Sequence, residues 1–144
     1  MKEHLSKVIL GMELLASLLV LGAVFSWAPV CSGLLTLQNG TMVHMKCFYS
    51  GQASVGLALI LLAAAIAAYL SKVDHNKIQG VIILIGIMII ANAYESVIGI
   101  GICRNAEMAC NTTVLWLKAG GALAITGGLL DILGNGVKTN KLIL

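Results

Sequence analysis

The chain has 144 residues, nine basic and six acidic side chains, and a formal net charge of +3 at pH 7. Hydrophobic residues make up 59% and charged residues only 10%, whereas soluble domains are about 45 to 50% apolar and about 25% charged. A domain this small has too much surface for its volume to bury such an excess in a water-soluble globule. The composition therefore predicts a membrane protein rather than a soluble enzyme. Because the cations are scattered singly, it also argues against a nucleic-acid partner.

Long stretches without charged residues locate four candidate membrane spans. A charge at mid-bilayer costs about 2.5 to 3.5 kcal/mol on insertion scales, and a spanning helix needs about 20 apolar residues. The expected helices cover about residues 7–27, 51–70, 78–101 and 112–133, with outer loops at about 28–50 and 102–111. Gly134-Asn135-Gly136 is expected to end the last helix. The sequence thus predicts an all-α membrane protein, a single four-helix transmembrane bundle over residues 1–144.

The distribution of Lys and Arg predicts the orientation, because cytoplasmic flanks keep the positive residues during insertion. One side of the predicted bundle carries six lysines: Lys2, Lys7, Lys72, Lys77, Lys138 and Lys141. The opposite loops carry only Lys46 and Arg104. Both termini are therefore expected in the cytoplasm. The first helix is expected to remain as a span, because its apolar stretch exceeds an ordinary signal-peptide core and no Ala-x-Ala cleavage site follows it.

This orientation places all four cysteines outside the membrane, Cys31 and Cys47 in the first outer loop and Cys103 and Cys110 in the second. An even number of thiols on the oxidising face is typical of disulfides. Four cysteines allow three pairings, and pairing within each loop is the simplest. A disulfide that closes a loop of about 15 residues contributes about 3 kcal/mol in the chain-entropy model.

The two outer loops resemble each other. Each contains a cysteine, a spacer and then Met-x-Cys leading into a glycine-bearing helix, as Met45-Lys46-Cys47 and Met108-Ala109-Cys110. This repetition indicates two parallel helical hairpins related by an axis along the membrane normal.

Three segments carry a resemblance to a known family: Pro29-Val30-Cys31, Met45-Lys46-Cys47-Phe48-Tyr49-Ser50-Gly51-Gln52-Ala53, and Ile98 to Cys103 followed by Met108-Ala109-Cys110. The chain resembles a bacterial family of small four-helix membrane proteins catalogued as a domain of unknown function, number four-four-one-eight. Members often carry an acid after Gln-Ala, where this chain has Ser54. The resemblance implies four spans, outer cysteines and an association with transport-type permeases, and it supplies no established activity.

Two further interpretations of the outer loops stay open. Met42, His44, Met45 and Cys47 place soft ligands within six residues, and such ligands suit Cu(I). No Cys-x-x-Cys or His-x-x-x-His spacing supports a metal centre, however, so neither a metal nor another cofactor is predicted. The second interpretation is a membrane thiol-disulfide oxidoreductase, because four helices with a cysteine pair in each outer loop form the layout of the quinone reductases that generate disulfides.

Ionisable residues within spans are candidates for function because they are costly to place there. Glu95 and Lys118 each lie about 9 Å inside the outer boundary at 1.5 Å per residue. The sequence predicts an ion pair between the third and fourth helices, with Asn92 and Tyr94 as neighbours, and a structural bridge is favoured over a proton or ion path. Glu13 and Asp131 are expected at solvated helix ends near the inner boundary.

Small residues on two helices suggest where a partner docks. The fourth helix carries Gly120, Ala124 and Gly128 on one face, and the second carries Ala63, Ala64, Ala67 and Ala68. Such faces allow close helix contacts. Because no nucleophile with a base and no phosphate-binding loop is apparent, an enzyme is not favoured. We expect an accessory or interaction subunit of a membrane complex, such as a transport complex, in contact with lipid and with another membrane protein or a second copy.

Overall fold

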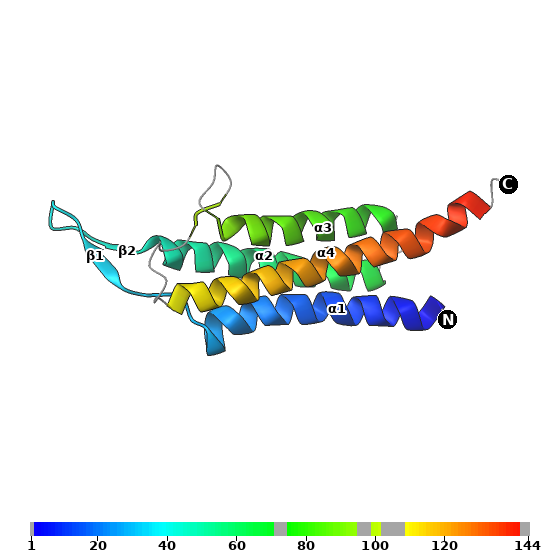
Figure 1. Ribbon diagram of the computed structural model, residues 1–144, viewed down its shortest axis with the longest axis horizontal. Helices are drawn as coiled ribbons and strands as arrows, with labels where there is room; N and C mark the ends of the chain where they lie inside the picture. Colours follow the sequence, from blue (N-terminus) through cyan, green and yellow to red (C-terminus); the bar gives the residue numbers. More distant parts are fainter. Residues whose placement is uncertain (1, 71–74, 95–98, 102–108, 142–144) are drawn as a thin grey trace.

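The structure is a computed structural model that describes residues 2–70, 75–94, 99–101 and 109–141. Its elements in chain order are α1 (Lys2–Gly22), a π-helical turn η1 (Ala23–Trp27), β1 (Leu34–Thr36), β2 (Met42–His44), α2 (Lys46–Leu70), α3 (His75–Asn92) and α4 (Ala109–Lys141). The helices run side by side in an elongated up-and-down bundle (Figure 1). We call the end that bears β1 and β2 the hairpin end, and the opposite end, where α1 begins and α4 ends, the terminal end.

The expected all-α four-helix membrane protein is confirmed. Three segments are long and apolar enough to cross a membrane, namely His4–Trp27, Lys46–Leu70 and Ala109–Gly134. The fourth, Asn76–Asn92, is a shorter apolar helix. Because a span needs about 20 apolar residues, α3 falls short of a full crossing by helix alone.

The helix boundaries differ from the expected ones at three places. First, α2 begins at Lys46 rather than at 51. Second, α3 ends at Asn92 rather than at 101, because the amides of Ala93 and Tyr94 bond the carbonyls of Ile90 and Ala91, three residues back, at 3.1 and 3.0 Å. Such bonds tighten and end a helix.

The third difference is that α4 begins at Ala109 rather than at 112 and continues through Gly134 to Lys141. The expected stop at Gly134-Asn135-Gly136 is therefore wrong. Among the residues that the structure describes, positive φ angles occur only at Gly40 and Gly101. The glycines of α4 thus keep right-handed helical backbone and do not act as left-handed caps.

The four helices form a closed ring in which each contacts two neighbours. The helix α4 packs on α1 and α3, and α2 packs on the same two helices. Buried aliphatic residues from all four helices fill the centre, including Val20, Leu61, Ile82, Ile89 and Leu117. Since lipid tails are as apolar as these side chains, close packing rather than the hydrophobic effect has to hold the ring together.

Close packing is tightest where α3 and α4 meet at Gly86 and Gly121. A Cβ atom added to Gly86 would lie 2.9 Å from the carbonyl oxygen of Gly121, and one added to Gly121 would lie 2.8 Å from that of Gly86. Both distances are too short for any side chain without a backbone shift. Glycine at these two positions therefore lets the helix backbones touch.

The small-residue face of α4 is used inside the bundle. A Cβ on Gly120 would lie 2.5 Å from the Val20 side chain of α1, and one on Gly128 would lie 2.7 Å from Ile83 of α3. Ala124, between them, is fully buried. This face is consequently unavailable to a partner, whereas on α2 Ala63 is exposed and Ala64 and Ala67 are half-buried.

We predict that Gly86→Ala destabilises the bundle by about 1–3 kcal/mol, the usual range for forcing extra atoms into a packed core. The matched control is Gly80→Ala on the same helix, where an added Cβ has no neighbour within 4 Å. The free energy of unfolding in mixed detergent micelles measures both. Equal stability of the two variants would refute the backbone contact.

Candidate functional site

A β-hairpin occupies the connection between α1 and α2. Its strands pair antiparallel, with Leu35 opposite Val43. The Gly40 amide bonds the Leu37 carbonyl at 2.8 Å, and Gly40 has a φ of 74°. The composition of this segment predicts a loop, and the structure shows a hairpin instead. The Asn39-Gly40 pair between apolar residues is a strong hairpin signal, so the hairpin could have been predicted from these two residues.

The hairpin projects beyond the helix ends along the long axis of the bundle (Figure 1). Its large apolar side chains are about half exposed or more: Leu34 at 53%, Leu35 at 51%, Leu37 at 49% and Met42 at 65%. Residues 33–45 contain no Asp, Glu, Lys or Arg. An isolated two-stranded hairpin is marginally stable in water, and a concentrated exposed apolar patch is typical of an interaction site.

The base of the hairpin contains the residues considered for copper. The ring of His44 stacks on Phe48 at 4.2 Å between centroids, and Met45 lies against Gly33. Cys47 is fully buried and is disulfide-bonded, so its sulfur is not available as a thiolate ligand. Within the described part of the chain, no group of three His, Cys, Asp or Glu side chains is placed to hold a metal ion. The copper hypothesis therefore gains no support from this geometry.

The segment that leaves α1 is fastened to the first two turns of α4. The Thr113 hydroxyl donates to the Ala28 carbonyl at 2.6 Å, and the rings of Trp27 and Trp116 meet edge to face at 5.6 Å. The sulfurs of Cys31 and Cys110 lie 3.1 Å apart. We call this set the junction; its residues are Trp27, Ala28, Cys31, Cys110, Thr113 and Trp116.

The cysteines are not arranged as the simplest pairing expects. Cys31 lies beside Cys110 of the other loop, and both are free thiols, with Cys31 half-buried and Cys110 buried. Their separation exceeds the length of about 2.05 Å of an S–S bond. Pairing of Cys31 with Cys47 within the first loop is therefore wrong. Cys103 lies outside the described residues.

The predicted ion pair is only partly visible, since Glu95 also lies outside the described residues. Lys118 places its Nζ over the Tyr94 ring, 4.5 Å from the centroid, which is a cation–π contact. Tyr94 is thus a neighbour of Lys118, as expected.

Asn92 is bonded elsewhere, in a polar clamp between α2 and α3. Its Nδ2 donates to the Ser50 carbonyl and to the Ser54 hydroxyl oxygen, both at 2.9 Å. The Ser50 hydroxyl donates back to the Asn92 carbonyl at 3.3 Å. All three residues are at most 5% exposed. The clamp therefore joins α2 to the last residue of α3.

The expectation of solvated positions for Glu13 and Asp131 is wrong. Glu13 is 1% exposed and Asp131 is 5% exposed. Both face the inside of the ring, because the packing of α4 on α1 and α3 turns these positions inward. Proximity to a helix end in the sequence gives depth but not the direction in which a side chain points.

Comparison with known proteins gives one match. A family model described as Domain of unknown function (DUF4418) matches residues 13–133. No curated protein and no solved structure matches the chain. The matched segment contains the hairpin, the junction, the clamp and the two buried carboxylates.

We predict that Asn92→Leu lowers the free energy of unfolding by about 1–2 kcal/mol, because it removes two hydrogen bonds in a buried site. Gln52→Leu, a change at an exposed position two residues after Ser50 on α2, should leave stability within about 0.5 kcal/mol. Unfolding in mixed micelles again provides the measurement. A loss in Gln52→Leu as large as that in Asn92→Leu would contradict the assigned clamp.

Proposed function

The chain belongs to the family described as Domain of unknown function (DUF4418), and from the structure we propose that the protein is an accessory subunit of a membrane complex. Its single transmembrane domain presents an apolar hairpin to a larger membrane protein. The observation that carries this proposal is the projecting hairpin, apolar and without charged residues.

The charge distribution supports an orientation with the terminal end in the cytoplasm. Lys2, Lys7, Lys77, Lys138 and Lys141 belong to the first residues of α1 and α3 or the last turns of α4. In the same proposal the hairpin end lies outside the membrane. The hairpin then extends away from the bilayer, where water rather than lipid surrounds its leucines.

The chemistry of the hairpin favours a protein partner over a lipid surface. Binding to anionic headgroups depends on clusters of Lys and Arg, and residues 33–45 have none. An apolar surface on the outer part of a partner would cover the side chains of Leu35 and Met42. A partner segment that pairs with β1 or β2 would also satisfy the backbone groups at the strand edges.

The junction supports the proposal because it fixes the base of the hairpin. We include in it a disulfide between Cys31 and Cys110, whose sulfurs are already in contact, so that the segment before β1 is tied covalently to α4. Cys47 and Cys103 are then the remaining pair. These bonds would hold the hairpin in one direction and reduce the entropy lost on docking.

A pair of hairpin variants tests the docking proposal. We expect Leu35→Asn with Met42→Asn to reduce cross-linking to a larger membrane protein at least tenfold, because the apolar contact is lost. Gln38→Ala with Thr41→Ser changes the same hairpin but keeps its leucines and should cross-link normally. A photoreactive residue at Leu37, activated in intact cells, provides the measurement. Equal cross-linking by both double variants, or none by the unaltered hairpin, would contradict the proposal.

A second function, thiol-disulfide exchange, is favoured by the arrangement of Cys31 and Cys110. The half-buried sulfur of Cys31 can be reached by a partner's thiolate, while the buried sulfur of Cys110 lies in contact with it as the resolving group. The exchange starts from the proposed Cys31–Cys110 disulfide: one thiolate of a partner dithiol attacks the Cys31 sulfur, a mixed disulfide forms, the Cys31–Cys110 bond breaks, and Cys110 leaves as a thiolate. The second partner thiol then releases Cys31, so that the partner is oxidised and the junction reduced.

Trapping distinguishes exchange from a structural disulfide. In an exchange protein, Cys110→Ser leaves Cys31 without its resolving partner, and a mixed disulfide with another protein should accumulate and disappear on reduction. The control is Cys31→Ser, which leaves only the buried sulfur and should trap nothing. Non-reducing electrophoresis of cells quenched with acid reveals either result. Absence of any mixed disulfide in Cys110→Ser would leave the structural role.

A further inference from the structure

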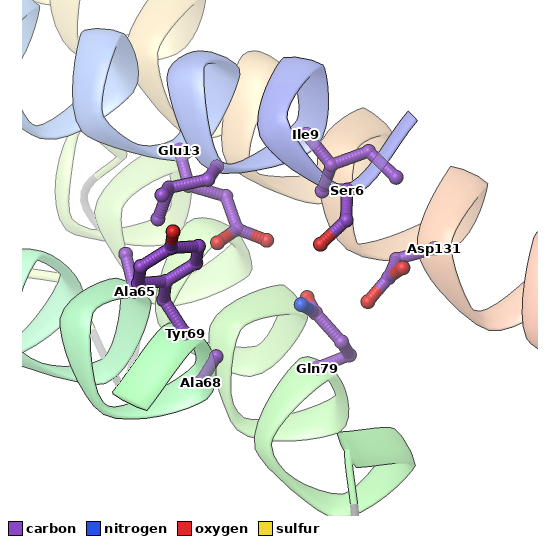
Figure 2. Close-up of a pocket in the computed structure, with 9 residues that line it drawn as sticks. Ser6, Ile9, Glu13, Ala65, Ala68, Tyr69, Gln79 and Asp131 are labelled. Carbon is purple, nitrogen blue, oxygen red and sulfur yellow. The ribbon is translucent and has the colours of Figure 1, made fainter. Parts of the chain in front are cut away.

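Two cavities in the bundle differ in size and polarity. The first, at the terminal end, has a volume of about 10 Å³, which is close to the least space that holds one water molecule. Figure 2 shows the side chains of Ser6, Glu13, Gln79 and Asp131 around it. The second lies at the hairpin end, between η1 and α2, and has a volume of about 390 Å³. Ligand pockets have volumes of about 300–1,000 Å³. We call the second cavity the apolar pocket.

The π-helical turn η1 forms one wall of the apolar pocket. The Ala28 amide bonds the Ala23 carbonyl, five residues back, at 3.0 Å, so this turn is wider than the α-helix before it. Val24 and Phe25 line the pocket from the turn. The Phe25 side chain is 72% exposed, so its ring stands at the edge of the pocket rather than in the core. Single π-helical turns are frequent at functional sites.

One face of α2 forms a second wall. Phe48, Gln52 and Val55 line the pocket, and their spacing of four and then three residues places them on the same side of the helix. They span seven residues, so this wall extends about 10 Å along the helix axis. Because α2 is long and apolar enough to cross a membrane, the long direction of the pocket follows that of the neighbouring acyl chains.

The exit from α1 forms the third wall. Pro29, Val30 and Ser32 line the pocket from this segment, which leads on to β1. The Val30 side chain packs on α2 at Gly51, where an added Cβ would lie 2.8 Å from Val30 Cγ2. Glycine at position 51 therefore lets the exit segment approach α2 closely enough to complete the pocket.

The lining of the apolar pocket carries no ionisable side chain. All of its residues belong to the described part of the chain, and the polar ones are Ser32 and Gln52. Both of these side chains are exposed, so they offer uncharged hydrogen-bonding groups at the rim. A pocket with apolar walls and a few polar groups fits a ligand that is apolar along its length and polar at one end.

The surroundings of the pocket indicate which ligand this is. The exposed residues Phe25 and Gln52 belong to the candidate spans His4–Trp27 and Lys46–Leu70, so the surface around the pocket faces lipid. Water is a poor occupant, because an ordered water needs two to four polar partners. We propose that the apolar pocket holds one acyl chain of a phospholipid from the leaflet on the hairpin side, with the polar end of the lipid near Ser32 and Gln52.

The bound chain contacts the segment that carries the hairpin. By packing against Pro29 and Val30, it orders the path from α1 to β1 whether or not the hairpin has a partner. This inference is therefore independent of the docking proposal. A lipid can occupy the pocket when no partner cross-links to the hairpin, and a partner can bind the hairpin when the pocket retains no lipid.

Photolabelling of the full chain in lipid nanodiscs tests the site. A phospholipid with a diazirine in one acyl chain is added as a minor component of the bilayer. Label on residues 24–32 is compared with label on residues 115–123 of α4, where the exposed Leu115 reports ordinary lipid contact. We expect about tenfold more label on residues 24–32, which corresponds to a preference of about 1.4 kcal/mol for the pocket. Equal labelling of the two segments would overturn the proposal, and so would absence of label from residues 24–32.

Variants locate the bound chain. Val55→Phe places a ring in the pocket and should lower the label on residues 24–32 to the level of α4. The matched control is Leu59→Phe, one turn further along α2 at an exposed position outside the lining, and it should keep the full label. An equal loss of label in Leu59→Phe would refute the site.

A second variant covers the case in which Val55→Phe fails to fold, since Val55 also packs against the core cluster. Phe25→Ala removes an exposed wall of the pocket, so it should leave the fold intact and lower the label on residues 24–32 several-fold. Leu115→Ala, a truncation at a similarly exposed position on α4, is its control and should leave that label unchanged. Full label in Phe25→Ala would place the chain elsewhere and refute the site.

Discussion

Contact between the backbones of α3 and α4 at Gly86 and Gly121 is the constraint on which the rest of the bundle depends. In lipid, apolar side chains gain little by leaving the solvent, so helices associate through close approach and interhelical hydrogen bonds. The glycine contact brings α4 close to α3, and Gly120 brings the same helix close to Val20 of α1. With α4 fixed against two neighbours, α2 closes the ring through the Asn92 clamp.

This packing separates the polar chemistry of the protein into two ends. At the hairpin end, the junction ties the exit from α1 to the start of α4, and the hairpin extends from this fixed base. At the terminal end, the same two helices bring Glu13 and Asp131 to one cavity with Gln79. The helix α4 contributes Cys110 and Thr113 at one end and Asp131 at the other. This single continuous helix therefore connects the two ends physically.

The sequence alone supported a large part of the fold. Charge-free stretches located four helices because the cost of a buried charge in lipid is high and general. They did not locate helix ends. The helix α3 ends at Asn92, where the next two amides bond carbonyls three residues back and the Asn92 side chain bonds α2. The helix α4 continues through Gly134, because glycine can also adopt right-handed helical backbone. The hairpin was not predicted, although Asn39-Gly40 between apolar residues is a hairpin signal. Charge-free stretches alone do not distinguish a short apolar strand from part of a span.

For the sites, the sequence determined which chemistry was present, and the tertiary structure decided which groups meet. Four cysteines and two carboxylates near helix ends could be named from the sequence, because residue type and depth follow from local order. Their partners could not, because three pairings of four cysteines have similar local cost and only the packing of α4 beside the exit of α1 sets Cys31 against Cys110. In the same way, sequence position gave the depth of Glu13 and Asp131, whereas the direction in which each helix turns them is fixed by its contacts with the other helices.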